Sequence, residues 1–276
     1  MQLLSSFRDY EIYKRLAELY DRLEETNIKL DALDADITEL TKAIRQGFFG
    51  FGQVLLTELG WECRPLFVWK AGSGIPFAVE VSDSGCYVKT VTPETAVSES
   101  AGCVNVQGLP GVELCCSSAA NSYVKCFWEF GLMPSLGKCA VTFTFTPVTV
   151  ATSDTLECGF EHQYSTNIYT FAVAYVQNQL YPVLWSGGAW QPLSGIETAC
   201  TFTQNSVVTY AFSFDLTAKN YVNAYVNTLF DVSSYSATVT TTTEAKYVNR
   251  CYVKVYHPDS VVTKFRLHEV GLWRLV

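Results

Sequence analysis

The first 46 residues repeat apolar side chains in alternating steps of four and three residues. This 3.5-residue period keeps one apolar seam facing a partner helix, so we predict an α-helical coiled-coil stalk over residues 1–46. Leucine dominates both seam positions, which favours three or more strands, and we expect a homotrimer. The alternative is an amphipathic helix that folds back on its own domain, although such helices usually show a 3.6-residue period. The seam residues are Ile12, Leu16, Leu19, Leu23, Thr26, Leu30, Leu33, Ile37, Leu40 and Ile44.

A segment rich in glycine and phenylalanine follows the heptads. The three glycines within Gly47–Gly52 predict the end of the helix, and the phenylalanines between them require burial. We expect residues 47–60 to form a neck in which Phe48, Phe49 and Phe51 of several chains pack around a common axis. A flexible linker is the alternative, but linkers seldom contain three phenylalanines.

From residue 61 onward, apolar and polar residues alternate in short runs that are typical of β-strands. Residues 141–146 alternate as Val-Thr-Phe-Thr-Phe-Thr, and later runs rich in Val, Thr, Tyr and Phe are separated by Gly, Asn, Ser or Asp. No long helical period occurs after residue 60, which argues against a Rossmann or βα-barrel enzyme. We therefore predict a mainly β chain whose head, residues 61–276, is an antiparallel β-sandwich of the jelly-roll kind.

Three segments near the C-terminus read as β-strands, the first two as a strand pair and the third as a last strand. They read YAFSFDLT from Tyr210, NAYVNTLF from Asn223 and KFRLHEVGLW from Lys264. This pattern resembles the strands of concanavalin A-like (laminin-G-type) jelly rolls, although Thr228 stands where that family often has glycine. The layout of stalk, neck and β head also resembles viral attachment fibres and spikes. The second resemblance implies a virion surface or another extracellular particle surface as the location.

Charge and hydropathy narrow the classes of function. Nineteen basic and 27 acidic residues give a net charge of −8, which argues against a nucleic-acid partner and against anionic membrane surfaces. The one charged residue between Gln163 and Phe214 is Glu197, but polar residues, Pro and Gly interrupt this stretch, so we expect no membrane insertion. The apolar run at Leu3 and Leu4 is too short for a signal peptide.

Ten cysteines lie in the head, and none of them forms a Cys-x-x-Cys pair. A zinc site or a thioredoxin-type redox centre therefore has little support. The even number in a β head predicts disulfides formed in an oxidising milieu, with open connectivity. The alternative is that several cysteines are small buried hydrophobic residues.

Catalytic motifs are scarce. No nucleophile elbow, phosphate-binding loop or His-Glu-x-x-His zinc motif occurs. Glu157, Glu161 and His162 come nearest to an acid/base cluster, but Glu161 and His162 would point to opposite faces of a strand. We expect a non-enzymatic protein without catalytic residues, metal or cofactor. A pair of carboxylates assembled from distant strands, as in β-sandwich carbohydrate-active enzymes, stays open as an alternative.

Aromatic and amide side chains gather around a hairpin turn that we predict at Ser186–Gly188. Flat rings beside amides suit carbohydrate or protein ligands. We therefore predict an oligomeric surface protein whose head binds a glycan or protein receptor; a structural coat or scaffold protein is the other non-enzymatic alternative. The alternative interpretation of the two tryptophans is that they pack across the hairpin into the sandwich core. The candidate ligand-binding residues are Trp185, Trp190, Tyr181, Tyr164 and Asn167.

Overall fold

The chain divides into two compact units, Met1–Gly50 and Phe51–Val276. In the first unit Leu19, Arg22, Thr26 and Lys29 are helical, and the seam residue Leu19 is 62% exposed in the single chain. The other seam residues except Thr26 lie outside the described residues, as do Phe48 and Phe49, so the coiled coil and the trimer stay predictions. Besides these four helical positions, the computed structural model describes residues 50–91, 110–131, 137–151, 154–176, 183–192, 204–225, 229–258 and 261–276.

The second unit begins with helix α2, Phe51–Glu58, within the predicted neck. The N–H groups of Phe51 and Gly52 have no partner within the helix, and they donate to the buried carboxylate of Glu269 at 3.1 and 2.8 Å. Leu55 and Leu56 pack against the outer side of the larger sheet. The second compact unit therefore includes α2 together with the strands of the predicted head. Within the described part of the chain, no helix is long and apolar enough to span a membrane.

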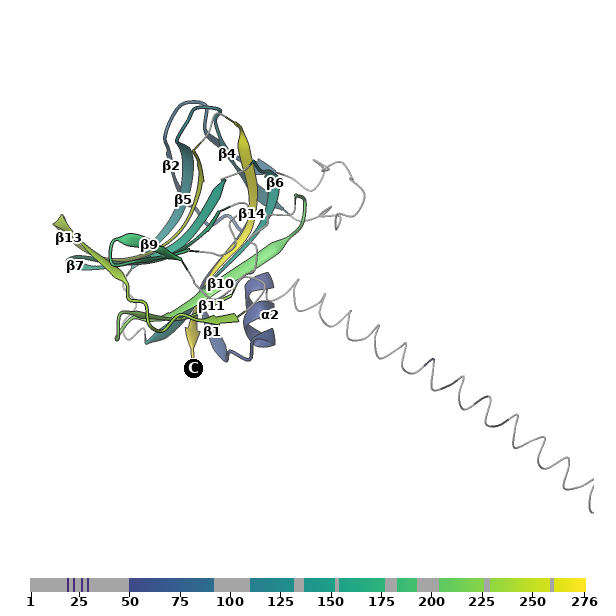
Figure 1. The fold of residues 1–276 in the computed structure, drawn as a ribbon. Helices are drawn as coiled ribbons and strands as arrows, with labels where there is room; N and C mark the ends of the chain where they lie inside the picture. Colours follow the sequence, from purple (N-terminus) through teal and green to yellow (C-terminus); the bar gives the residue numbers. More distant parts are fainter. Residues whose placement is uncertain are drawn as a thin grey trace, which may run out of the picture. The chain divides into compact units, whose positions relative to one another are not determined.

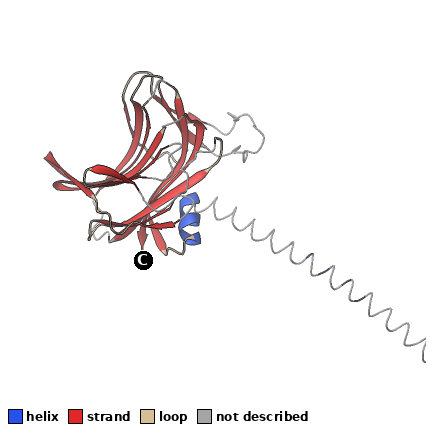
Figure 2. Cartoon of the chain, in the orientation of Figure 1, coloured by secondary structure: helices blue, strands red, loops and turns tan. Residues whose placement is uncertain are grey.

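The described strands of the head form two antiparallel sheets (Figures 1 and 2). The larger sheet has eight strands, and β1 pairs with the half of β14 that β4 leaves free. Its order is β12 (Leu229–Asp231), β11 (Asn220–Tyr225), β10 (Val208–Asp215), β6 (Lys138–Thr149), β14 (Thr263–Leu275), β4 (Gly111–Cys116) and β3 (Tyr87–Val91), with β1 (Cys63–Lys70) beside β14.

The smaller sheet has six strands, and its central strand β13 pairs with β5 on one side and β7 on the other. Its outer face carries the groove described below. Its order is β2 (Ala78–Val81), β5 (Ser122–Gly131), β13 (Thr238–His257), β7 (Thr155–Val176), β8 (Val183–Ser186) and β9 (Ala189–Pro192).

The core lies between the inner faces of the two sheets. On β6 the predicted alternation places Val141, Phe143 and Phe145 in this core. Phe160 of the smaller sheet stacks on Phe214 of the larger one, with 4.8 Å between ring centroids. The prediction of a mainly β head is confirmed, and two antiparallel sheets enclose one apolar core.

Strand β7 turns back on itself at Ser165, whose φ of 58° is unusual for a non-glycine residue. Phe160 before the turn and Phe171 after it both stack on Phe214, so the two halves of β7 lie close together. Gln163 stabilises the turn because its Nε2 donates to the carbonyl oxygens of Ser165 and Glu244 at 3.1 and 2.8 Å. The outer face of the smaller sheet therefore receives side chains from both halves of β7.

The cysteines within the described residues are free thiols, so the predicted disulfides are not supported there. Most of these side chains face the core, where burial raises the thiol pKa, and this agrees with the alternative of small buried hydrophobic residues. Cys103 and Cys200 lie outside the described residues. The free thiols are Cys63, Cys86, Cys115, Cys116, Cys126, Cys139, Cys158 and Cys251.

Candidate functional site

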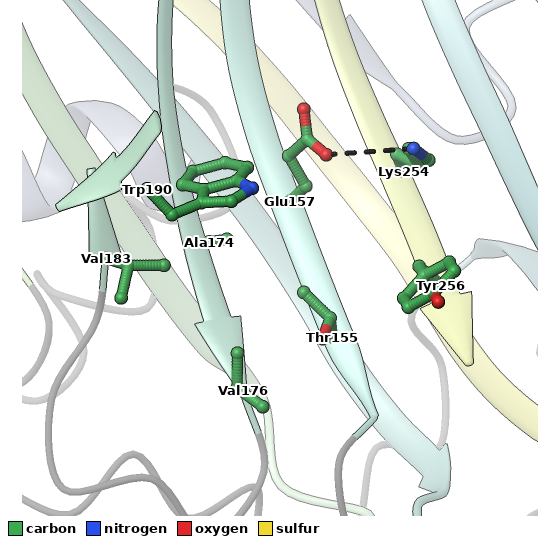
Figure 3. A pocket seen from close by; sticks show the side chains of 8 residues that line it. All are labelled: Thr155, Glu157, Ala174, Val176, Val183, Trp190, Lys254 and Tyr256. Carbon is green, nitrogen blue, oxygen red and sulfur yellow. Dashed lines mark ion pairs between the residues drawn. The ribbon is translucent and has the colours of Figure 1, made fainter. Parts of the chain in front are cut away.

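A groove runs across the outer face of the smaller sheet, and we call it the sheet groove. It consists of two hollows of about 450 and 420 Å³, which share Trp190, Glu157 and Lys254 (Figure 3). The first hollow is completed by Thr155, Ala174, Val176, Val183 and Tyr256. The second is completed by Glu80, Tyr123, Lys125, Glu161, Thr170, Trp185 and Tyr252.

The two-residue period of a strand decides which side chains reach the groove. On β13, Val253 and Val255 are buried in the core. The residues that alternate with them, Tyr252, Lys254 and Tyr256, line the groove. The sequence signal for this face is the alternation Tyr-Val-Lys-Val-Tyr over residues 252–256. Its outward-facing residues include a lysine, and charged residues are scarce in the head.

The carboxylates of the groove are bound to partners within the protein. The Tyr252 hydroxyl donates to Glu157 Oε1 at 2.6 Å, and Lys254 Nζ lies 4.0 Å from Glu157 Oε2. Glu161 lies between two cations, with Arg250 Nη1 at 2.8 Å from one oxygen and Lys125 Nζ at 3.5 Å from the other. This mutual pairing fixes the directions of the polar groups and balances their charges.

Tyr252 lies flat in the groove because its neighbour on β7, Gly159, has no side chain. A Cβ at Gly159 would overlap the Tyr252 ring, and Lys125 Nζ lies over that ring at 4.2 Å from its centroid. Burial raises the pKa of the Tyr252 hydroxyl well above its usual range, and the negative charges of Glu157 and Glu161 raise it further. The hydroxyl therefore stays protonated and donates to Glu157.

Trp185 and Trp190 face each other across the β8–β9 hairpin, whose turn at Gly187 and Gly188 has positive φ angles of 63° and 80°. The predicted hairpin is confirmed. The two indole rings meet edge to face, with centroids 5.1 Å apart. Both tryptophans line the groove, and Trp190 is 37% exposed. Leu184, which directly precedes Trp185 on β8, takes the core position, and neither tryptophan belongs to the core cluster.

The other predicted ligand-binding residues lie elsewhere or are not described. Tyr164 and Asn167 flank the turn of β7 and do not line either hollow. Tyr164 is 53% exposed and packs edge to face against Tyr247, with centroids 5.2 Å apart. Tyr181 lies outside the described residues. Of the predicted ligand-binding residues, Trp185 and Trp190 therefore line the groove, and the prediction did not include Glu157 or Lys254 beside them.

The histidines have local structural partners. His162 Nδ1 bonds Asn249 Oδ1 at 2.9 Å, and burial lowers the pKa of this imidazole. His257 bonds Asp154, and both side chains are fully buried. His268 bonds Thr146 at 2.8 Å beneath the larger sheet's outer surface. In the described ranges, no three His, Cys, Asp or Glu side chains converge to hold a metal ion.

Comparison of the sequence with protein-family models finds no match, and no curated protein matches the sequence. Comparison with solved structures finds several that are similar at low identity. The chain is similar to a carbohydrate esterase from the Shiga toxin-encoding bacteriophage phi24B, at 11% identity and a TM-score of 0.43, over 78% of this chain and 100% of that one. It is also similar to the cellulose-induced protein Cip1, at 11% identity and a TM-score of 0.45, over 75% and 96% of the two chains.

A lectin from Bauhinia forficata is similar at 10% identity and a TM-score of 0.37, over 75% of this chain and 97% of the lectin. At these identities and scores, the similarity carries no conclusion about the function of this chain.

Proposed function

We propose that the sheet groove binds a neutral carbohydrate chain and that Trp190 is its stacking surface. The observation that carries the proposal is the position of Trp190, which is exposed at the rim shared by both hollows, beside Glu157 and Lys254. An indole face packs against the C–H face of a sugar ring, while fixed carboxylate and ammonium groups bond to its hydroxyls.

The charge pattern supports a neutral ligand. Glu157 and Glu161 are paired with Tyr252, Lys254, Lys125 and Arg250, so both lysines that line the groove already contact a carboxylate. The remaining carboxylate of the second hollow, Glu80, accepts from the Tyr123 hydroxyl at 2.7 Å. The net charge of −8 opposes the approach of a polyanion. Binding of a neutral glycan is therefore expected to change little with salt concentration.

The head acts, in this proposal, as the receptor-binding part of a trimeric attachment protein on a virion or cell surface. The heptad pattern supports the trimer, and the exposed seam residue Leu19 is available to a second helix. Three grooves on one stalk would convert weak single-site binding into strong attachment. A structural coat or scaffold protein, the alternative, would form regular assemblies and bind no glycan.

The test is a glycan-binding screen of the full chain, followed by titration of Trp190→Ala and Tyr164→Ala. Loss of the Trp190 ring is expected to weaken binding about tenfold or more, because an aromatic contact contributes beyond its buried area. Tyr164→Ala removes an exposed ring outside the groove and is expected to leave affinity unchanged. A blank screen, or loss of binding only in Tyr164→Ala, would contradict the proposed site.

A second candidate function is glycoside hydrolysis, which is favoured by Glu157 and Glu161 on one face of β7 in the same groove. Glycosidases use two carboxylates across the scissile bond. Here both oxygens of Glu161 already contact cations, and Glu157 accepts from Tyr252. We therefore favour binding without hydrolysis. Sugar release from polysaccharides that Glu157→Gln or Glu161→Gln abolishes would establish the enzyme.

A further inference from the structure

The two hollows of the sheet groove differ in chemistry. Beyond their shared rim, the second hollow is lined by charged and hydroxyl groups such as those of Glu161, Lys125 and Tyr252. The first has Thr155 and Tyr256 beside the Glu157–Lys254 pair, and it also presents three aliphatic side chains, those of Ala174, Val176 and Val183. In Figure 3 these three lie together on one side of the hollow, with Trp190 above them and the dashed Glu157–Lys254 pair across from them.

A sugar with only hydroxyl substituents suits the polar hollow better than the aliphatic one. Hydroxyls placed against Ala174, Val176 and Val183 would lose water without gaining hydrogen-bond partners, which costs free energy. A substituent that carries a methyl group would instead remove apolar surface from water on both sides. The first hollow, at about 450 Å³, has room for a sugar unit together with such a substituent.

We infer that the sheet groove selects chains of N-acetylated sugars, and this inference rests on the proposed function. The acetamido methyl group packs against Ala174, Val176 and Val183, and the sugar ring stacks on Trp190. Hydroxyls of the next unit bond to the polar side chains of the second hollow. The acetamido group is uncharged, so it also suits the first hollow, where the charges of Glu157 and Lys254 are paired with each other.

The test compares chitopentaose with cellopentaose by isothermal titration calorimetry on the full chain. The two ligands share length and linkage and differ in a 2-acetamido group in place of a 2-hydroxyl. We expect chitopentaose to bind at least about fourfold more tightly, which corresponds to burial of one methyl-sized group. Equal affinities, or tighter binding of cellopentaose, would overturn the inference.

Val183→Thr supplies the residue-level test, because it keeps the side-chain shape and places a hydroxyl in the aliphatic hollow. The ratio of chitopentaose affinity to cellopentaose affinity should fall severalfold, because the acetamido methyl group loses an apolar contact and a sugar hydroxyl gains a hydrogen-bond partner. Val176→Thr should do the same if Val183→Thr folds poorly. The matched control is Val239→Thr, at a β13 position that is 52% exposed and lines neither hollow. An unchanged preference in both groove variants would overturn the inference.

Failure of the inference can be distinguished from failure of the proposed function. A protein that binds neutral glycans through Trp190 without a preference for acetylated chains keeps the function and loses the inference. A protein that binds no glycan in the broader screen loses both.

Discussion

The substitution Gly159→Ala tests whether the polar network of the sheet groove depends on one missing side chain. The new Cβ would overlap the Tyr252 ring, which is 3% exposed and has little room to move. Displacing the ring separates its hydroxyl from Glu157, to which it donates at 2.6 Å, and disturbs the contact with Lys125. The change therefore affects both stability and the ligand-binding surface.

The expected loss of stability combines two effects. Overpacking a buried site costs about 1–3 kcal/mol, and a lost hydrogen bond to a charged group costs about 1.5–3 kcal/mol. The replacement of glycine by alanine offsets part of this loss, because alanine lowers the conformational entropy of the unfolded chain. We expect the free energy of unfolding, measured in urea, to fall by about 3 kcal/mol, which corresponds to a fall in Tm of about 6–12 °C for a unit of this size. Glycan affinity should fall in the same variant.

Two comparisons make this prediction sharp. Gly131→Ala, at the end of β5, adds a Cβ that meets no atom within 4 Å and should leave stability unchanged. In a double-mutant cycle, Gly159→Ala should cost almost nothing in a Tyr252→Ala background, because the ring that it would displace is absent. Equal costs of Gly159→Ala in both backgrounds would refute the proposed contact.

Three further predictions concern other parts of the chain. Burial raises the pKa of the Glu269 carboxyl above its unfolded value of about 4.3. The stability that this group contributes is therefore present below that value and is lost as pH rises through the folded pKa. Urea unfolding between about pH 4 and 7 should show this loss in the wild type and not in Glu269→Gln. Burial raises the thiol pKa of Cys116, Cys126 and Cys139 to about 12, so iodoacetamide followed by mass spectrometry should label them in urea but not in the native protein. Light scattering should give three times the single-chain mass for the full chain and a monomer for a chain starting at Gly50; a monomeric full chain would contradict the coiled coil.

Local pattern was enough to predict the β character of the head, several of its later strands and one turn. The alternation over residues 141–146 places the phenylalanines of β6 in the core, and Gly187 and Gly188 adopt the positive φ angles that the hairpin requires. These features depend on neighbours in sequence, since a strand's period and a turn's backbone are local properties.

The rest of the site depends on contacts between distant segments. No glycine in the sequence predicts the turn of β7 at Ser165, yet this turn brings Ala174 and Glu157 to one groove. Gly52 reads as a residue that ends a helix, but Glu269, far along the chain, caps the helix that starts there. Alternation shows that Glu157 faces outward and cannot show which strands lie beside it.

The ion pairs of the groove need an explanation other than the stability of the fold. An exposed sheet face can be covered by threonine and serine, and partly exposed ion pairs such as Arg250–Glu161 and Lys254–Glu157 add little stability. Fold stability alone therefore does not account for them. What they do is hold the Tyr252 hydroxyl, two carboxylates and two ammonium groups in fixed positions beside Trp190. A preorganised set of donors and acceptors lowers the entropy cost of holding an uncharged polar ligand, and it leaves the adjoining aliphatic hollow to discriminate among the substituents of that ligand.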